Sequence, residues 1–180
     1  MKENYFIIHG SYGNPYKNWI PWLYQYITKK GNKCVVPHFP SHSEQNYINW
    51  SSLLQQYVKY GYINENTIFI THSLGGIFAV KFLEQNQIKI KKMITIAGFN
   101  HIPYEEKDLY ESFYIENAIK NIEISDTTIS IYSNNDPYVS EMKAIEFANL
   151  INAKKIKVEE AGHFTKKDGF DKLELIKEFL

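Results

Sequence analysis

A serine, an aspartate and a histidine each follow a short apolar run that is typical of a strand. They are Ser73, Asp136 and His163, in that order along the chain. A serine hydroxyl is a weak nucleophile at neutral pH, so an imidazole must accept its proton as it attacks a carbonyl carbon. A carboxylate then holds the imidazole in the productive tautomer and stabilises the imidazolium. We therefore expect Ser73 to be a nucleophile, His163 its base and Asp136 the acid that orients this base.

The stretch around Ser73 predicts a strand, a sharp turn and a helix. An apolar run over 67–70 leads into Thr71-His72-Ser73-Leu74-Gly75, and apolar residues resume at Ile77. A serine on such a turn projects its hydroxyl above the sheet, and the usual pattern is G-x-S-x-G. Thr71 stands at the first glycine position, so the match is incomplete. An ordinary turn with a capping serine is the alternative interpretation of these five residues.

Strands and helices are predicted to alternate along the whole chain. The expected strands cover 5–9, 33–36, 67–72, 93–97, 128–132 and 156–159. Apolar residues at helical spacing predict helices over 19–27, 48–58, 77–83, 109–119, 144–151 and 170–179, with the third buried and the fifth capped by Ser140. This alternation predicts a single α/β domain over residues 1–180, with a mostly parallel sheet of about six strands and helices on both faces.

The places of the three residues in this sheet favour a catalytic triad. Functional groups collect at the carboxyl ends of parallel strands, and the three residues fall in the loops after the third, fifth and sixth predicted strands. Taken singly, Asp136 before Pro137 could open a turn and His163 could be a solvated loop residue. Taken together, three strand ends in the order serine, acid, histidine indicate acyl-transfer catalysis.

Backbone N–H groups beside Ser73 are candidates for the oxyanion hole that such a reaction needs. We expect one from Leu74 at the start of the helix and one from Ser11 in the loop after the first strand, with Tyr12 as the competing choice for the second. Tyr12, Tyr138 and Phe164 flank the candidate residues and are expected to line the substrate pocket.

The remaining histidines and the single cysteine could also take part in chemistry, but we expect them to have structural roles. His9 is expected to support its loop, His72 to pack with its side chain directed away from Ser73, and Cys34 to be a buried thiol. Three further histidines lack metal-ligand spacing and are typical of loops: His38, His42 and His101. We expect no metal and no cofactor.

Charge and composition indicate which classes of binding partner and substrate are less favoured for this protein. The 180 residues carry 20 basic and 20 acidic side chains, so neither nucleic acid nor an anionic membrane is an expected partner. Every basic residue is lysine, which makes phosphorylated substrates less favoured because no bidentate guanidinium is present. No apolar signal stretch precedes the first strand and no apolar run is long enough to span a bilayer, which predicts a cytoplasmic, soluble protein.

Several motifs together resemble a known family. The matching segments are Ile8-His9-Gly10, Asn18-Trp19-Ile20-Pro21-Trp22-Leu23, Pro37-His38-Phe39-Pro40, Trp50, Thr71-His72-Ser73-Leu74-Gly75-Gly76, Ser133-Asn134-Asn135-Asp136-Pro137-Tyr138-Val139 and Gly162-His163-Phe164. Nearly the whole chain is similar to the small serine-hydrolase family that includes the YdeN-like proteins and the retinoblastoma-binding serine hydrolase. The resemblance implies a minimal α/β-hydrolase fold without a large lid, and a triad of Ser73, Asp136 and His163. Thr71 and Asn135 depart from the family pattern, which usually has glycine or alanine and often has aspartate there.

We therefore expect a serine hydrolase, a carboxylesterase that cleaves small-molecule carboxylic esters, thioesters or amides through an acyl-enzyme on Ser73. The alternative is a regulatory module of hydrolase descent that binds a protein partner with little turnover, which Thr71 and the missing lid motivate. A flavodoxin-like or nucleotide-binding domain ranks last, because Gly10-Ser11-Tyr12-Gly13 is neither G-x-G-x-x-G nor a P-loop.

Overall fold

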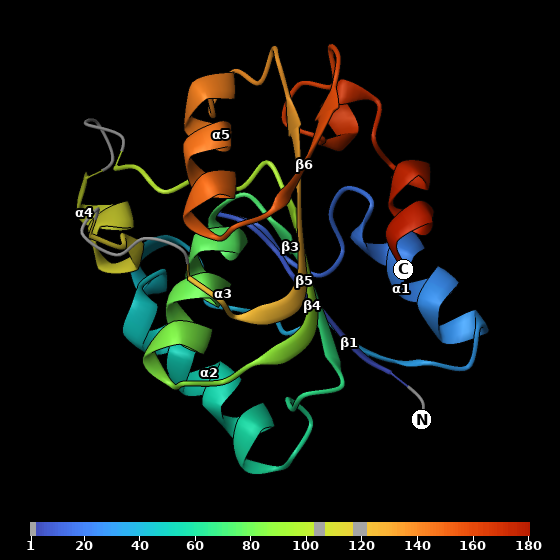
Figure 1. The fold of residues 1–180 in the computed structure, drawn as a ribbon, viewed down its shortest axis with the longest axis vertical. Helices are drawn as coiled ribbons and strands as arrows, with labels where there is room; N and C mark the ends of the chain where they lie inside the picture. Colours follow the sequence, from blue (N-terminus) through green and yellow to red (C-terminus); the bar gives the residue numbers. More distant parts are fainter. Residues whose placement is uncertain (1–2, 103–106, 117–121) are drawn as a thin grey trace.

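Six parallel strands form one sheet in the computed structural model, which describes residues 3–102, 107–116 and 122–180. All five strand pairings are parallel, and the strand order is β2-β1-β3-β4-β5-β6 (Figure 1). The strands are β1 (Asn4–Ile8), β2 (Lys33–Val35), β3 (Thr67–His72), β4 (Ile90–Ile96), β5 (Ser125–Ser133) and β6 (Lys154–Val158). The predicted α/β sheet is confirmed, and β3, which leads to Ser73, lies in its interior.

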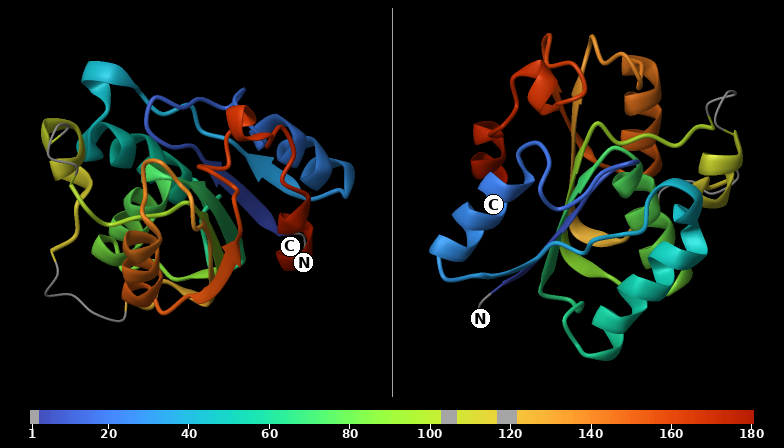
Figure 2. Two further views of the ribbon diagram at one scale, coloured as in Figure 1. Left: turned by 90° about the horizontal axis from the view of Figure 1, so that it is seen from above. Right: turned by 180° about the vertical axis from the view of Figure 1, so that it is seen from behind.

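Helices cover both faces of the sheet, as the crossover connections of parallel strands require. One face carries α1 (Ile20–Lys29) and the terminal 3-10 helix Glu174–Phe179, while the other carries α2 (Tyr47–Lys59), α3 (Leu74–Gln85) and α5 (Glu141–Leu150) (Figures 1 and 2). The predicted cap of α5 is present, since Ser140 Oγ accepts a hydrogen bond from the Lys143 N–H at 3.4 Å. Within the described ranges, no helix has the length and apolar character needed to cross a bilayer.

Successive residues of the strands point to opposite faces of the sheet and pack into two separate hydrophobic cores. Phe6 and Ile8 of β1 join the cluster beneath α2, α3 and α5, whereas Tyr5 and Ile7 join the cluster beneath α1. Every apolar residue of α3 is buried, which confirms it as the central helix predicted from its dense apolar sequence. The buried helix starts directly after Ser73, so the position of this residue is fixed by the core of the protein.

The segment after β4 is less helical than predicted. Instead of one helix over 109–119, the structure has α4 (Lys107–Tyr110) and a single 3-10 turn, Glu111–Phe113, after which Tyr114 is extended. The Asn100 side chain explains the end of the helical turn, because it donates to the Ile115 carbonyl and accepts from the Ile115 N–H at 2.9 and 3.0 Å. The remainder of the predicted helix, 117–119, lies outside the described residues.

Candidate active site

Ser73 occupies the turn between β3 and α3, as predicted. Its backbone lies at φ 54° and ψ −126°, a strained conformation for a residue with a side chain. The Ser73 N–H donates to the Ile96 carbonyl at 2.8 Å, which holds the turn against the end of β4. Thr71 does not prevent this turn, because its side chain is fully buried in β3, where it pairs in register with Ile8 and Thr95.

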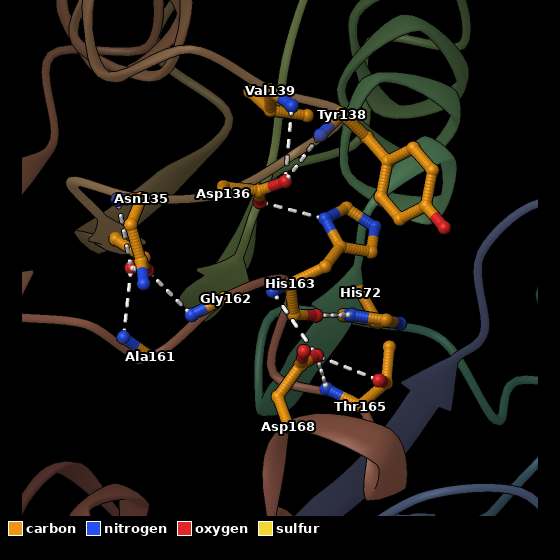
Figure 3. Close-up of polar contacts among 11 residues, drawn as sticks. His72, Asn135, Asp136, Tyr138, Val139, Ala161, Gly162, His163, Thr165 and Asp168 are labelled. Atoms are coloured by element: carbon orange, nitrogen blue, oxygen red, sulfur yellow. Dashed lines mark hydrogen bonds and ion pairs between the residues drawn. The ribbon is translucent and has the colours of Figure 1, made fainter.

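Asp136 and His163 form a buried hydrogen-bonded pair. His163 Nδ1 donates to Asp136 Oδ2 at 2.6 Å, and the two side chains are 9% and 2% exposed, respectively (Figure 3). A carboxylate can only accept, so the ring hydrogen that faces Asp136 sits on Nδ1, and this tautomer leaves Nε2 as the acceptor of the imidazole. The other carboxylate oxygen, Oδ1, accepts from the N–H groups of Tyr138 and Val139 at 2.8 and 3.0 Å. Asp136 therefore both shapes a turn and orients the imidazole.

Three side chains just before Asp136 hold the loop that carries His163. Asn134 Oδ1, Ser133 Oγ and Asn135 Oδ1 accept from the N–H groups of residues 160, 161 and 162 at 2.8, 3.0 and 2.8 Å. The end of β5 and the start of the loop after it are thus tied to three successive backbone N–H groups of the loop after β6. Asn135 supplies its contact through a neutral amide oxygen, so an aspartate is not required at this position to hold the loop.

The Ser73 and His163 side chains are not hydrogen-bonded to each other in the described structure. The residue before Ser73, His72, contacts His163, with the two ring centres 5.0 Å apart, so the strand that carries the serine lies against the loop that carries the histidine. His72 Nε2 also lies 2.9 Å from the His163 carbonyl oxygen. In free enzymes the bond between nucleophile and base is often long and tightens only when substrate binds.

The loop after β1 lies directly against Ser73. A Cβ atom on Gly10 would lie 2.8 Å from Ser73 Cβ and 3.4 Å from Ser73 Oγ, so only glycine allows this approach. His9 supports the loop as predicted: the Phe39 N–H donates to His9 Nε2 at 3.1 Å, and His9 Nδ1 therefore donates to the Gly10 carbonyl at 2.9 Å. Burial lowers the pKa of His9 to about 4, which keeps its ring neutral for these two bonds.

Gln45 distinguishes between the two predicted oxyanion donors of this loop. Its Oε1 accepts from the Tyr12 N–H at 2.9 Å, and its Nε2 donates to Ser11 Oγ at 2.8 Å. The Tyr12 N–H is thereby occupied, whereas no described residue accepts a hydrogen bond from the Ser11 N–H. Leu74 is the first residue of α3, and N–H groups of a first helical turn have no acceptor within the helix.

The three predicted pocket residues occupy different environments. Tyr138 is 72% exposed. Its ring and that of His163 make an edge-to-face contact, with their centres 5.0 Å apart (Figure 3). Tyr12 is also exposed, and its ring lies 5.3 Å from that of His42. Phe164, in contrast, is fully buried beneath α1 and packs on Phe170, so the structure places it in the core.

Two residues with roles at the site, Gln45 and Asp168, were not predicted from the sequence, because nothing in their local sequence marks the contacts they make. Gln45 lies on a loop with no recognisable motif, and Asp168 accepts from the His163 N–H at 3.2 Å from a turn five residues later. His72, predicted to pack, also donates a hydrogen bond. Cys34, expected to be buried, is only partly buried against the core beneath α1, and its surroundings raise the pKa of the thiol to about 12. Among the described residues, no three His, Cys, Asp or Glu side chains gather as a metal site would require.

A parallel α/β sheet with a serine on a strained strand-to-helix turn defines the α/β-hydrolase class, and no large lid covers this site in the described part of the chain. The chain belongs to the serine hydrolase family, whose model matches residues 5–180. This membership confirms the resemblance noted in the sequence.

Similar proteins match over nearly the whole chain. YdeN of Bacillus subtilis is 26% identical over 184 residues, which cover 100% of this chain and 95% of YdeN. The crystal structure of the B. subtilis ydeN gene product superposes with a TM-score of 0.87 at 25% identity, covering 99% of this chain and 96% of that one. MGS-MChE2, an α/β hydrolase enzyme from a sediment metagenome of the Mar Chica lagoon, Morocco, gives a TM-score of 0.74 at 17% identity, covering 99% and 89%.

Proposed function

We propose that this protein is a carboxylesterase that cleaves small carboxylic esters, thioesters or amides through an acyl-enzyme on Ser73. The observation that carries the proposal is the buried Asp136–His163 pair beside a serine on a strained turn. Each of these features is costly to maintain in a fold, and acyl-transfer catalysis uses both. Membership of the serine hydrolase family supports the same reaction class.

In the proposed first step, Ser73 Oγ attacks the substrate carbonyl carbon while its proton passes to His163 Nε2. Asp136 keeps the hydrogen on Nδ1 and stabilises the imidazolium that forms. The imidazolium then donates its proton to the leaving alcohol, thiol or amine, and the acyl group stays on Oγ. Water, deprotonated by the same imidazole, hydrolyses the acyl-enzyme and restores the serine.

We assign the oxyanion hole of this reaction to the N–H groups of Leu74 and Ser11. The Leu74 N–H stands at the amino end of α3, where the helix dipole favours negative charge. The Ser11 N–H has no acceptor among the described residues, and Gln45 fixes the loop through the Ser11 hydroxyl and the Tyr12 N–H. Two preorganised donors of this kind stabilise the charge that appears only in the transition state.

Small substrates fit the exposure of the site. The described residues include no large lid that would enclose a long acyl chain, and Ser73 is only 8% exposed, so we propose that the ester it attacks carries little bulk beside its carbonyl. Tyr12, in the loop after β1, and Tyr138, beside His163, are exposed aromatic residues, and we propose that they contact the acyl or leaving group.

The test is hydrolysis of a panel of short-chain activated esters by the parent protein and by Ser73→Ala. We expect the substitution to lower kcat by roughly three orders of magnitude or more, because the nucleophile is lost. Ser52→Ala, an exposed serine of α2, is the matched control and should retain parental activity. Equal activity in Ser73→Ala would overturn the assignment, while a folded parent without any esterase activity would favour the protein-binding alternative.

A further inference from the structure

Both backbone polar groups of His163 are hydrogen-bonded to side chains from other parts of the chain. The His163 carbonyl oxygen accepts from His72 Nε2 at 2.9 Å, and the His163 N–H donates to Asp168 Oδ2 at 3.2 Å (Figure 3). With Asp136 on the ring, three side chains from three different loops or strands fix this one residue. Such a set restricts both the position of the imidazole and its rotation.

The His72 contact is the more deeply buried of the two. The His72 ring lies between Trp19 and His163, with ring-centre distances of 5.8 and 5.0 Å. A carbonyl oxygen can only accept, so the hydrogen must sit on His72 Nε2. Burial lowers the pKa of His72 to about 3, and the ring therefore stays a neutral donor over the physiological range.

The Asp168 contact is part of a compact turn. Asp168 Oδ2 also accepts from the Thr165 N–H at 2.9 Å and from Thr165 Oγ1 at 2.6 Å. Gly162, at φ 54°, lies so close that a Cβ atom there would be 2.5 Å from Asp168 Oδ1. Although burial alone would raise the pKa of Asp168, these hydrogen bonds hold it below the usual range, so the carboxylate remains an acceptor.

We propose that His72 and Asp168 are positioning residues that set the distance between the nucleophile and its base. His72 directly precedes Ser73, so its bond to the His163 carbonyl joins the nucleophile's strand to the base's loop without an intervening residue. Asp168 holds the His163 N–H, on the peptide unit that precedes the His163 carbonyl. Displacement of a reacting group by about 1 Å can lower a rate by roughly a hundredfold, so this spacing is a property that the reaction depends on. The inference rests on the function proposed above.

Matched pairs of variants test the proposal. In His72→Gln the amide nitrogen lies three bonds from Cβ, as Nε2 does in histidine, whereas in His72→Asn it lies one bond nearer to Cβ. Asp168→Asn keeps an acceptor oxygen, and Asp168→Ala removes it. For ester hydrolysis we expect kcat to fall about 10- to 100-fold in His72→Asn and Asp168→Ala with little change in KM, and to stay within about threefold of the parent in His72→Gln and Asp168→Asn.

A second measurement does not depend on turnover. The NMR resonance of the His163 Nδ1 proton, hydrogen-bonded to Asp136, should shift or broaden in His72→Asn and Asp168→Ala and be retained in the two conservative variants. Asp168 is exposed, so its variants are expected to fold, and they test the proposal even if His72→Asn does not fold. Parental kcat and an unchanged resonance in Asp168→Ala would overturn the proposal, as would equal losses in His72→Gln and His72→Asn. Absence of esterase activity in the parent would instead contradict the proposed function, with the NMR comparison still deciding this inference.

Discussion

The Asp136 carboxylate uses its two oxygens for two different tasks. Oδ1 accepts from the N–H groups of Tyr138 and Val139, and Oδ2 accepts from the imidazole of His163. From the sequence, a turn-forming aspartate and a triad aspartate were alternatives, because Asx-Pro is common turn chemistry. The structure combines the two, and the turn is what aims Oδ2 at the histidine.

Asp136→Asn separates these two tasks. The asparagine oxygen can still accept from the turn, but its NH₂ group would face His163 Nδ1 and favour the tautomer with hydrogen on Nε2. We expect kcat to fall by roughly three to four orders of magnitude, as loss of the triad carboxylate does in serine proteases, with the melting temperature little changed. Asp171→Asn, an exposed aspartate, serves as the control. Undiminished ester hydrolysis in Asp136→Asn would exclude the assigned role.

Candidate roles for Ser73 and His163 could be predicted because each residue stands in a recognisable local motif at the end of a strand. Gln45 and Asp168 could not be predicted, since glutamine and aspartate are mostly exposed residues in proteins and nothing in the sequence marks Gln45 as buried. Their partners are Tyr12, 33 residues away, and the backbone of His163. Only the folded loops bring these groups together, and no periodicity in the sequence encodes that contact.

At the scale of elements, regular segments were predicted well and irregular ones poorly. The apolar runs of β3 and α3 are long and bounded by clear signals, and both formed where expected. The segment after β4 carries a helical pattern, but its described part forms only α4 and one 3-10 turn before Tyr114 is extended, and the Asn100 side chain is hydrogen-bonded to the Ile115 backbone. At Ile115, hydrogen bonds to a side chain distant in sequence thus compete with the local propensity to form a helix.

The loop after β1 gives a prediction at this scale. Gln45→Ala removes the hydrogen bonds that fix the loop at Ser11 and Tyr12, so the proposed oxyanion donor loses its orientation. We expect kcat to fall about 10- to 100-fold with a smaller change in KM, because the oxyanion forms only in the transition state. Gln55→Ala, an exposed glutamine of α2, is the matched control. A Gln45→Ala enzyme with parental kcat would contradict the assignment of Ser11.

A second prediction at the scale of elements concerns Thr71 in strand β3. Thr71 is fully buried and its Oγ1 has no hydrogen-bond partner, so Thr71→Val removes a desolvated hydroxyl without changing the shape of the side chain. We expect the free energy of unfolding in urea to stay the same or to rise by about 1 kcal/mol, with activity retained.

Thr67, at the other end of the strand, provides the contrast. Its Oγ1 accepts from the Asn64 N–H at 2.9 Å, and the residue is equally buried. Thr67→Val should therefore lower the free energy of unfolding by about 1 to 3 kcal/mol. Equal losses in both variants would show that the Thr71 hydroxyl has a favourable role, and that its departure from the family pattern stabilises this protein.

For the whole molecule, two buried histidines make stability depend on pH. Burial lowers the pKa of His9 to about 4 and that of His72 to about 3, whereas both titrate near 6.5 in the unfolded chain. Below pH 6.5 the unfolded chain binds protons that the folded protein does not, so stability is complete above this pH and falls as the pH drops toward 4. The loss is on the order of 3 kcal/mol for each histidine, at about 1.4 kcal/mol per pH unit.

Urea unfolding at a series of pH values between 7.5 and 4 measures this slope. His9→Gln should flatten it, because one of the two titrating groups is gone. A stability that stays constant across this range, or that rises toward acid, would contradict the neutral state assigned to both rings.

The most direct measurement of the central claim is covalent labelling with a fluorophosphonate, followed by intact mass and peptide mapping. We predict one adduct per chain, on Ser73, formed much more slowly in His163→Ala and absent in Ser73→Ala. A folded protein that remains unmodified at Ser73, or is labelled equally fast without His163, would contradict the account.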